Sequence, residues 1–222
     1  TYVEKQRDDG HHVLKPSNVL KLCRAVLSVD TASGREQVAY YDVGVGSLSR
    51  HPGVSNRLLA GADKLLGGAY GAGFENNIEE ALNFLVLNYR TGAELFVFGF
   101  SRGAATARAL TRFLDWAGGL PEKRDAYYLP RLFRAYLGTR GEGSAAEEKR
   151  AIDADRAREK SPREPLAPFL RVDVRFLGVW DTVMALGSRF RAAGEGTSTV
   201  SKSFHVDRQP ASIVRHARQA LA

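Results

Sequence analysis

The sequence predicts an α/β fold in which helices cover a mostly parallel sheet. Two observations lead to this prediction. First, two short and almost continuously apolar runs, residues 94–100 (ELFVFGF) and 172–183 (VDVRFLGVWDTV), are typical of strands that are buried on both faces of a parallel sheet. Second, helical patterns stand before, between and after these runs, which is the alternation expected of helix and strand layers around one core.

Length and composition place the chain among globular domains. It has 222 residues, of which 44% are hydrophobic and 26% charged, and this balance argues against disorder, collagen-like repeats and a coiled coil. No apolar run reaches the ~20 residues that span a bilayer, and residues 1–12 contain no apolar signal-peptide core. The single cysteine, Cys23, excludes an internal disulfide framework and a cysteine-based zinc site. We therefore expect one domain over residues 1–222.

The formal net charge is +7, from 32 basic and 25 acidic residues. A basic surface can attract nucleic acid, anionic lipid or acidic proteins. The basic residues are interleaved with acidic ones, as in residues 147–164, and no arginine-rich block with interleaved aromatic residues is present. The sequence therefore argues against nucleic-acid binding. Peripheral contact with an anionic membrane surface stays open, and it would suit an enzyme that acts on lipids.

In the N-terminal half, residues 17–26 (SNVLKLCRAV) predict an amphipathic helix that Ser17 or Asn18 caps. Residues 37–42 are rich in β-forming side chains and predict a strand that runs into a glycine pair. An amphipathic helix of about four turns is predicted for residues 74–90, directly before the first buried strand.

After the first strand, residues 101–119 predict a helix that a glycine pair ends. Two polar helical stretches, residues 125–137 and 145–158, follow within the segment 121–168, which we interpret as a helical insertion or cap over the sheet. The second buried strand comes next. Residues 210–222 (PASIVRHARQALA) predict a last helix that begins at the proline.

The strongest chemical signal is Gly99-Phe100-Ser101-Arg102-Gly103, a G-x-S-x-G pattern between the first strand and the helix that follows it. This is the setting of a nucleophile elbow, in which a strained turn lifts the serine hydroxyl above the sheet. Side chains at either glycine would clash with the neighbouring strand and helix, and the backbone N–H of Arg102 would donate to an oxyanion. The alternative is that Ser101 only caps the helix, but a plain cap needs no glycine on both sides.

A serine nucleophile needs a base, and the base needs an acid that orients it. In the chain order Ser–Asp–His the acid follows a later strand, and Asp181 stands directly after the apolar run RFLGVW. The alternative is that Asp181 caps a turn; Asp173 and Asp207 are weaker candidates for the acid. Of the histidines after Asp181, His216 is a weak candidate for the base because arginines flank it, and His205 is a weaker one.

No metal ion or organic cofactor is expected. The adjacent His11 and His12 have no acidic partner at the spacing of a metal site. The sequence Gly44-Val45-Gly46 lacks the further glycine or the lysine of a phosphate-binding loop. The chemistry expected of Ser101 requires neither kind of group.

Four stretches together resemble a known family: SNVLKLCRAV (17–26), YYDVGVGS (40–47), LFVFGFSRGAATARAL (95–110) and FLGVWDTVMALG (176–187). They are similar, in the same order, to the DUF2235 family, which includes the catalytic domain of Tle1-type phospholipase effectors of type VI secretion. The resemblance implies an α/β-hydrolase-like three-layer sandwich. It also implies that Ser101, the serine of GFSRGA, is the nucleophile and that Asp181, the aspartate of WDTV, is the acid of the triad.

The chain departs from the family pattern at both ends. The family opens with a strand and an Asp-Gly-Thr turn, of which Thr1 would be the last residue. The resemblance implies that the catalytic histidine of the family would fall well beyond Ala222. We therefore expect a fold that is incomplete at both ends, and a chain that is inactive by itself.

The resemblance implies a serine-dependent carboxylic ester hydrolase that acts on phospholipid acyl esters. An effector of this kind would be a soluble protein in the cytoplasm of the producing cell, exported without a classical signal peptide, with secretion or immunity partners that the sequence does not identify. Two alternatives stay open. One is a non-catalytic binding module on a hydrolase fold, and the other is an esterase or thioesterase for small soluble substrates.

Overall fold

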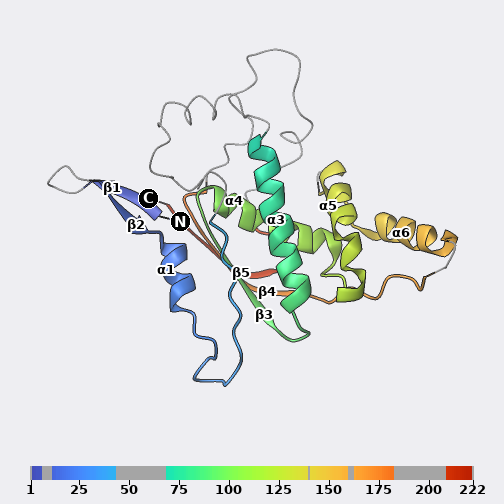
Figure 1. Cartoon of the computed structure of the whole chain (residues 1–222), viewed down its shortest axis with the longest axis horizontal. Coiled ribbons are helices and arrows are strands. Elements are labelled where there is room, and N and C mark those ends of the chain that lie inside the picture. Colours follow the sequence, from blue (N-terminus) through green and yellow to red (C-terminus); the bar gives the residue numbers. More distant parts are fainter. Residues whose placement is uncertain are drawn as a thin grey trace, which may run out of the picture.

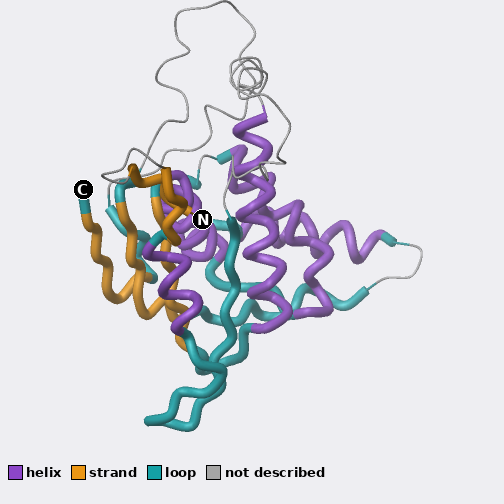
Figure 2. The backbone as a smooth tube through the Cα atoms, turned by 60° about the vertical axis from the view of Figure 1, so that its left-hand side comes forward, coloured by secondary structure: helices purple, strands orange, loops and turns teal. Residues whose placement is uncertain are grey.

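The computed structural model describes most of the chain, namely residues 2–6, 12–43, 69–139, 141–159, 163–182 and 209–221. These residues form the predicted α/β fold, in which helices pack on a three-stranded parallel sheet (Figure 1). Figure 2 shows the strands gathered on one side of the molecule and the longer helices on the other. None of the described helices has the length and apolar character of a membrane span.

The chain opens with an antiparallel hairpin that the sequence did not predict, formed by β1 (Tyr2–Gln6) and β2 (His12–Pro16). β2 leads directly into α1 (Asn18–Ala25). The buried Ser17 caps this helix, because its Oγ accepts a hydrogen bond from the backbone N–H of Leu20 at 3.2 Å. The predicted helix is therefore confirmed, and Ser17 rather than its neighbour is the cap.

The strand that we predicted for residues 37–42 is not formed. Residues 37–43 have no regular secondary structure, and the segment after α1 turns back on itself through a single bridge between Val29 and Glu36. β-forming side chains make a strand only where a neighbouring strand pairs with their backbone groups. In the described part of the chain no strand pairs with residues 37–42.

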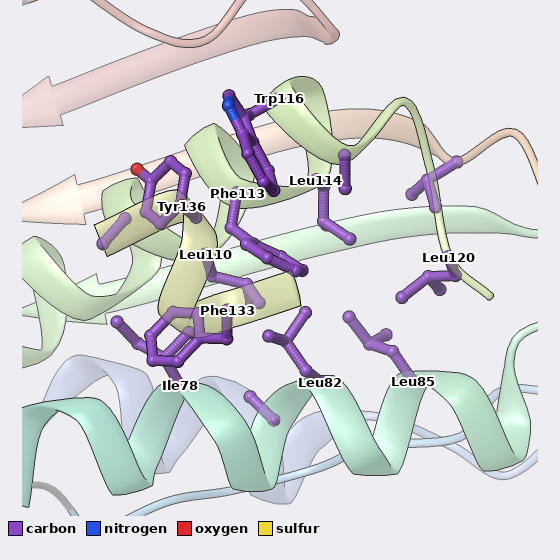
Figure 3. Packing of buried hydrophobic residues seen from close by; sticks show 14 of the residues in the cluster. Ile78, Leu82, Leu85, Leu110, Phe113, Leu114, Trp116, Leu120, Phe133 and Tyr136 are labelled. Atoms are coloured by element: carbon purple, nitrogen blue, oxygen red, sulfur yellow. The ribbon is translucent and has the colours of Figure 1, made fainter. Parts of the chain in front are cut away.

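Of the two long helices, α4 (Arg102–Ala117) packs on the sheet and α3 (Ala69–Asn88) packs against α4. α3 begins five residues before its predicted start, and α4 ends at Gly118, whose φ of 68° lies in the left-handed region that glycine tolerates. Figure 3 shows the core between these helices. Apolar side chains of α3 meet those of α4 there, and all are buried: Ile78, Leu82, Leu85, Leu110, Phe113 and Leu114.

The sheet has the strand order β3–β4–β5. β3 (Glu94–Phe100) and β4 (Asp173–Trp180) confirm the two predicted strands, and β5 (Val214–Ala220) pairs with β4 on its other side. α1 contacts β3. The last residues of the three strands pair with one another in a single row, so the strands end at the same level.

β5 shows that the helix predicted for residues 210–222 was wrong. Val214 and Ala217 pack against the core three residues apart, and this spacing also fits one side of a helix. The preference of alanine and arginine for a helix is small, at roughly a few tenths of a kcal/mol per residue. A continuous ladder of hydrogen bonds with β4 outweighs this preference. The chain before β5 is also fixed, because the Asp115 carboxylate of α4 accepts hydrogen bonds from the backbone and side chain of Ser212.

The segment 121–168 contains the 3-10 helix η1 (Lys123–Tyr128), α5 (Leu129–Gly138) and α6 (Ala146–Arg158). Its helical character agrees with the prediction. α5 packs against α3 and α4, and it extends the core with two aromatic rings. The rings of Phe133 and Tyr136 each lie 5.5 Å from the ring of Phe113, centroid to centroid, in edge-to-face contact. The interpretation of this segment as a cap over the sheet stays a prediction.

Candidate active site

The candidate active site lies at the carboxyl edge of the sheet, one residue beyond the row in which the strands end. Ser101 follows β3 and Asp181 follows β4. The backbone N–H of Ser101 donates to the carbonyl oxygen of Trp180 at 2.9 Å, and the N–H of Asp181 donates to that of Ala220 at 3.0 Å. Because adjacent strands lie about 4.8 Å apart, the structure brings Ser101 and Asp181 to neighbouring positions on one edge.

The backbone of Ser101 is strained. Its φ of 54° and ψ of −119° lie in a region that non-glycine residues seldom adopt, at a cost of roughly 1–3 kcal/mol. The side chain makes no capping hydrogen bond to α4, although Ser101 occupies the N-cap position. The geometry is therefore that of the strained strand–turn–helix elbow, and it does not support the alternative in which Ser101 merely caps the helix.

The two glycines of the motif have different surroundings. A Cβ atom built on Gly99 would lie 2.3 Å from the carbonyl oxygen of Gly103 and 2.6 Å from the Cα of Ala104. Only glycine at position 99 therefore allows the first turn of α4 to pack so closely on the end of β3. A Cβ atom on Gly103 would meet no described atom within 4 Å, so the clash that we predicted there is not found.

Asp181, like Ser101, has a positive φ. Among the described residues these two are the only non-glycine residues with a positive φ, which is 42° at Asp181. Strained backbone is concentrated at functional sites, because the surrounding structure must hold it in place. The alternative in which Asp181 caps a turn with Val183 or Met184 depends on residues outside those described.

The first turn of α4 faces this edge with its positive end. The first N–H groups of a helix have no partner within the helix, and they carry a partial positive charge. The first turn contains Arg102 and no acidic residue that would neutralise this charge. The backbone at Arg102 is therefore suited to donate to an oxygen atom that becomes negative beside Ser101.

The structure does not bring His216 to this site. His216 lies exposed on β5 and pairs with Phe176, four residues before the strand ends at Ala220. At a rise of about 3.3 Å per residue, it lies roughly 16 Å below the level of Ser101, which is too far for an imidazole to join Ser101 and Asp181. His205, the other histidine candidate, lies outside the described residues.

The two weaker candidates for the acid, Asp173 and Asp207, are not found beside Ser101 in the described structure. Asp173 begins β4 at the opposite edge of the sheet, where its Oδ1 accepts a hydrogen bond from Nε of Arg215 at 2.6 Å. Asp207 lies outside the described residues. In the described part of the chain no three histidine, cysteine or acidic side chains gather in a way that could hold a metal ion.

Sequence reasoning gave no role to Thr182, the residue after Asp181. Its Oγ1 is shielded from solvent and has no hydrogen-bond partner in the described structure. No sequence pattern signals such a residue, because burial of a single hydroxyl depends on how distant segments pack. Trp180, the residue before Asp181, is half-buried, and its ring centroid lies 6.3 Å from that of Phe98.

Comparison with known proteins identifies a family and one similar yeast protein. Uncharacterized protein YEL023C of Saccharomyces cerevisiae is 31% identical over 105 residues, which make up 46% of this chain and 15% of the yeast protein. No solved structure is significantly similar. The family model of the catalytic domain of Tle1-like phospholipase effectors of type VI secretion matches residues 3–222. Because this match covers almost the whole chain, the chain belongs to the family of Tle1-like phospholipase effector catalytic domains.

Proposed function

We propose that this domain is a serine hydrolase that cleaves acyl esters of phospholipids, with Ser101 as the nucleophile and Asp181 as the acid. The observation that carries the proposal is the strained backbone of Ser101 between β3 and α4. The position of Asp181 at the end of the adjacent strand supports it. Membership of a family of phospholipase-type hydrolases supports a lipid substrate.

In the proposed reaction the Ser101 hydroxyl attacks the ester carbonyl and gives its proton to a histidine. The carbonyl oxygen becomes an oxyanion, and the backbone N–H of Arg102 at the start of α4 donates to it. The histidine then gives the proton to the departing alcohol, and water releases the fatty acid from Ser101 by the same steps. Asp181 holds the imidazole in the required orientation and stabilises its charged form. The base in this proposal is a histidine other than His216.

The test uses the full-length protein and a fluorophosphonate, which reacts covalently with activated serines. We expect wild-type protein to be labelled at Ser101 and Ser101→Ala to be unlabelled, with turnover lower by about 10⁴–10⁶. The matched control is Ser28→Ala, because Ser28 is exposed and lies after α1, outside the site. Absence of labelling in well-folded wild-type protein would favour the non-catalytic binding module.

Substrate class needs a second measurement. An enzyme that acts on membrane lipid should hydrolyse phospholipid vesicles or micelles faster than monomeric short-chain esters at equal ester concentration. Including anionic lipid in the vesicles tests whether the basic net charge of +7 assists binding. A rate that is highest on the monomeric esters would instead identify an esterase for small soluble substrates.

A further inference from the structure

Trp180 joins the two residues of the candidate site. A peptide bond links it to Asp181, and its carbonyl oxygen accepts a hydrogen bond from the backbone N–H of Ser101 at 2.9 Å. A shift of the Trp180 backbone would therefore change the spacing between the Ser101 hydroxyl and the Asp181 carboxylate. Because a bridging imidazole fits only a narrow range of spacings, the contacts that hold Trp180 bear on the reaction.

The ring of Trp180 contacts Phe98 on the adjacent strand. The two ring centroids lie 6.3 Å apart, and the Phe98 ring lies 5.7 Å from the ring of Phe176 between centroids. Both distances are those of packed aromatic pairs. Phe98 pairs with Gly178, which stands midway between Phe176 and Trp180 along β4. Side chains alternate along a strand, so the Phe98 ring lies on the face of β4 that carries both of these rings.

Gly178 provides the space for this arrangement. A Cβ atom built on it would lie 2.8 Å from Cδ1 of Phe98 and 2.9 Å from Cε1 of Phe176, closer than the 3.0 Å that real Cβ atoms keep. The Phe98 ring therefore covers a position of β4 that has no side chain. If β3 moved along β4, the ring would leave this space and meet the side chain of a neighbouring residue.

The strand of Phe98 carries Ser101, and the strand of Trp180 carries Asp181. The contact between the two rings thus joins the two strands just below the candidate site. We propose that Phe98 is a positioning residue, which holds Trp180 and thereby fixes the spacing of Ser101 and Asp181. This inference rests on the proposed function, because it requires that the two residues act together through a base.

The test measures kcat per active site in the full-length protein. Active sites are counted by complete fluorophosphonate labelling, at a temperature at which circular dichroism shows every variant to be folded. Phe98→Leu keeps an apolar side chain and removes the ring. We expect kcat on phospholipid vesicles to fall at least about tenfold with little change in KM, because misplacement by about 1 Å can slow a reaction about 10²-fold. A residue that only stabilises the fold would lower Tm and leave kcat per active site unchanged.

The matched control is Phe96→Leu, which removes the same ring two residues earlier on β3, where the side chain is 52% exposed. It should keep wild-type kcat and KM. A second comparison uses Gly178→Ala, whose methyl group would displace the Phe98 ring and should lower kcat by itself. In Phe98→Leu/Gly178→Ala the methyl group has the space that the ring leaves, so kcat should exceed the value expected from multiplying the two single losses.

Wild-type kcat per active site in Phe98→Leu would overturn the proposal and leave the proposed function intact. Equal impairment by Phe96→Leu would also overturn it, because the loss would not depend on contact with Trp180. Losses that multiply in the double variant would do the same, since the ring and the glycine would then act independently. If wild-type protein neither turns over ester nor reacts with the fluorophosphonate, the proposed function fails and this inference fails with it.

Discussion

Replacing Gly99 by alanine tests the elbow directly. The added Cβ would lie 2.3 Å from the carbonyl oxygen of Gly103, and real Cβ atoms do not approach other atoms within 3.0 Å. Both nearest contacts belong to the backbone of α4, so the end of β3 and the first turn of α4 would have to separate by roughly 1 Å. Overpacking of this kind costs about 1–3 kcal/mol, and a rigid backbone neighbour places Gly99→Ala in the upper half of that range.

For a domain of this size, a loss of about 2–3 kcal/mol lowers Tm by roughly 4–12 °C. The displacement also moves Ser101, and misplacement by about 1 Å can slow a reaction about 10²-fold, so the rate of fluorophosphonate labelling should fall as well. Thermal unfolding followed by circular dichroism and time-resolved labelling measure the two effects.

Gly103→Ala is the matched control, because it adds the same methyl group four residues later, where no described atom lies within 4 Å. Alanine is preferred over glycine in a helix by about 0.5–1 kcal/mol, so this variant should be as stable as wild type or slightly more stable. If Gly99→Ala and Gly103→Ala unfold at the same temperature, the close packing of β3 on α4 is not what requires glycine at position 99.

Two further predictions concern stability. Asp125 and Arg156 form a buried ion pair at 2.8 Å, so Asp125→Ala should lower the free energy of unfolding, measured by urea titration, by about 3–5 kcal/mol. The control Arg158→Ala removes an exposed charge and should change this free energy by less than about 1 kcal/mol. Equal losses in the two variants would contradict the reasoning. Burial, with a smaller contribution from the charge of Glu79, raises the pKa of Glu75 in the folded protein. The protonated Glu75 side chain is therefore compatible with the fold at low pH, and the protein loses stability as pH rises through the folded-state pKa and Glu75 becomes charged. Glu75→Gln should therefore be more stable than wild type at pH 7 and equal to it below about pH 4, and a difference that does not vary with pH would exclude this explanation.

Local patterns were sufficient where one segment carries its own signal. The run of residues 94–100 is apolar at nearly every position, which only a strand buried on both faces requires, and the glycines and serine that follow define the turn into α4. The same reasoning placed Asp181 at the end of the second strand, and the register of β3 with β4 confirms that the two positions are adjacent.

Patterns failed where a partner elsewhere in the chain decides the conformation. Residues 37–42 have strand-forming side chains, but no described strand pairs with them. The helix-favouring residues of β5, in contrast, pair with β4. The hairpin of β1 and β2 was missed for the same reason, since neither short strand is distinctive until it is paired.

The sequence by itself determined the α/β class, the place of Ser101 in a turn between a strand and a helix, and the place of Asp181 directly after the second buried strand. These features depend on side-chain chemistry and on the order of neighbouring residues. The tertiary structure decided that His216 is remote from Ser101, that position 99 rather than 103 lacks room for a side chain, and that the Thr182 hydroxyl is buried. Each of these depends on the distance between segments far apart in the chain, and such distances are fixed by strand register and helix packing rather than by local sequence.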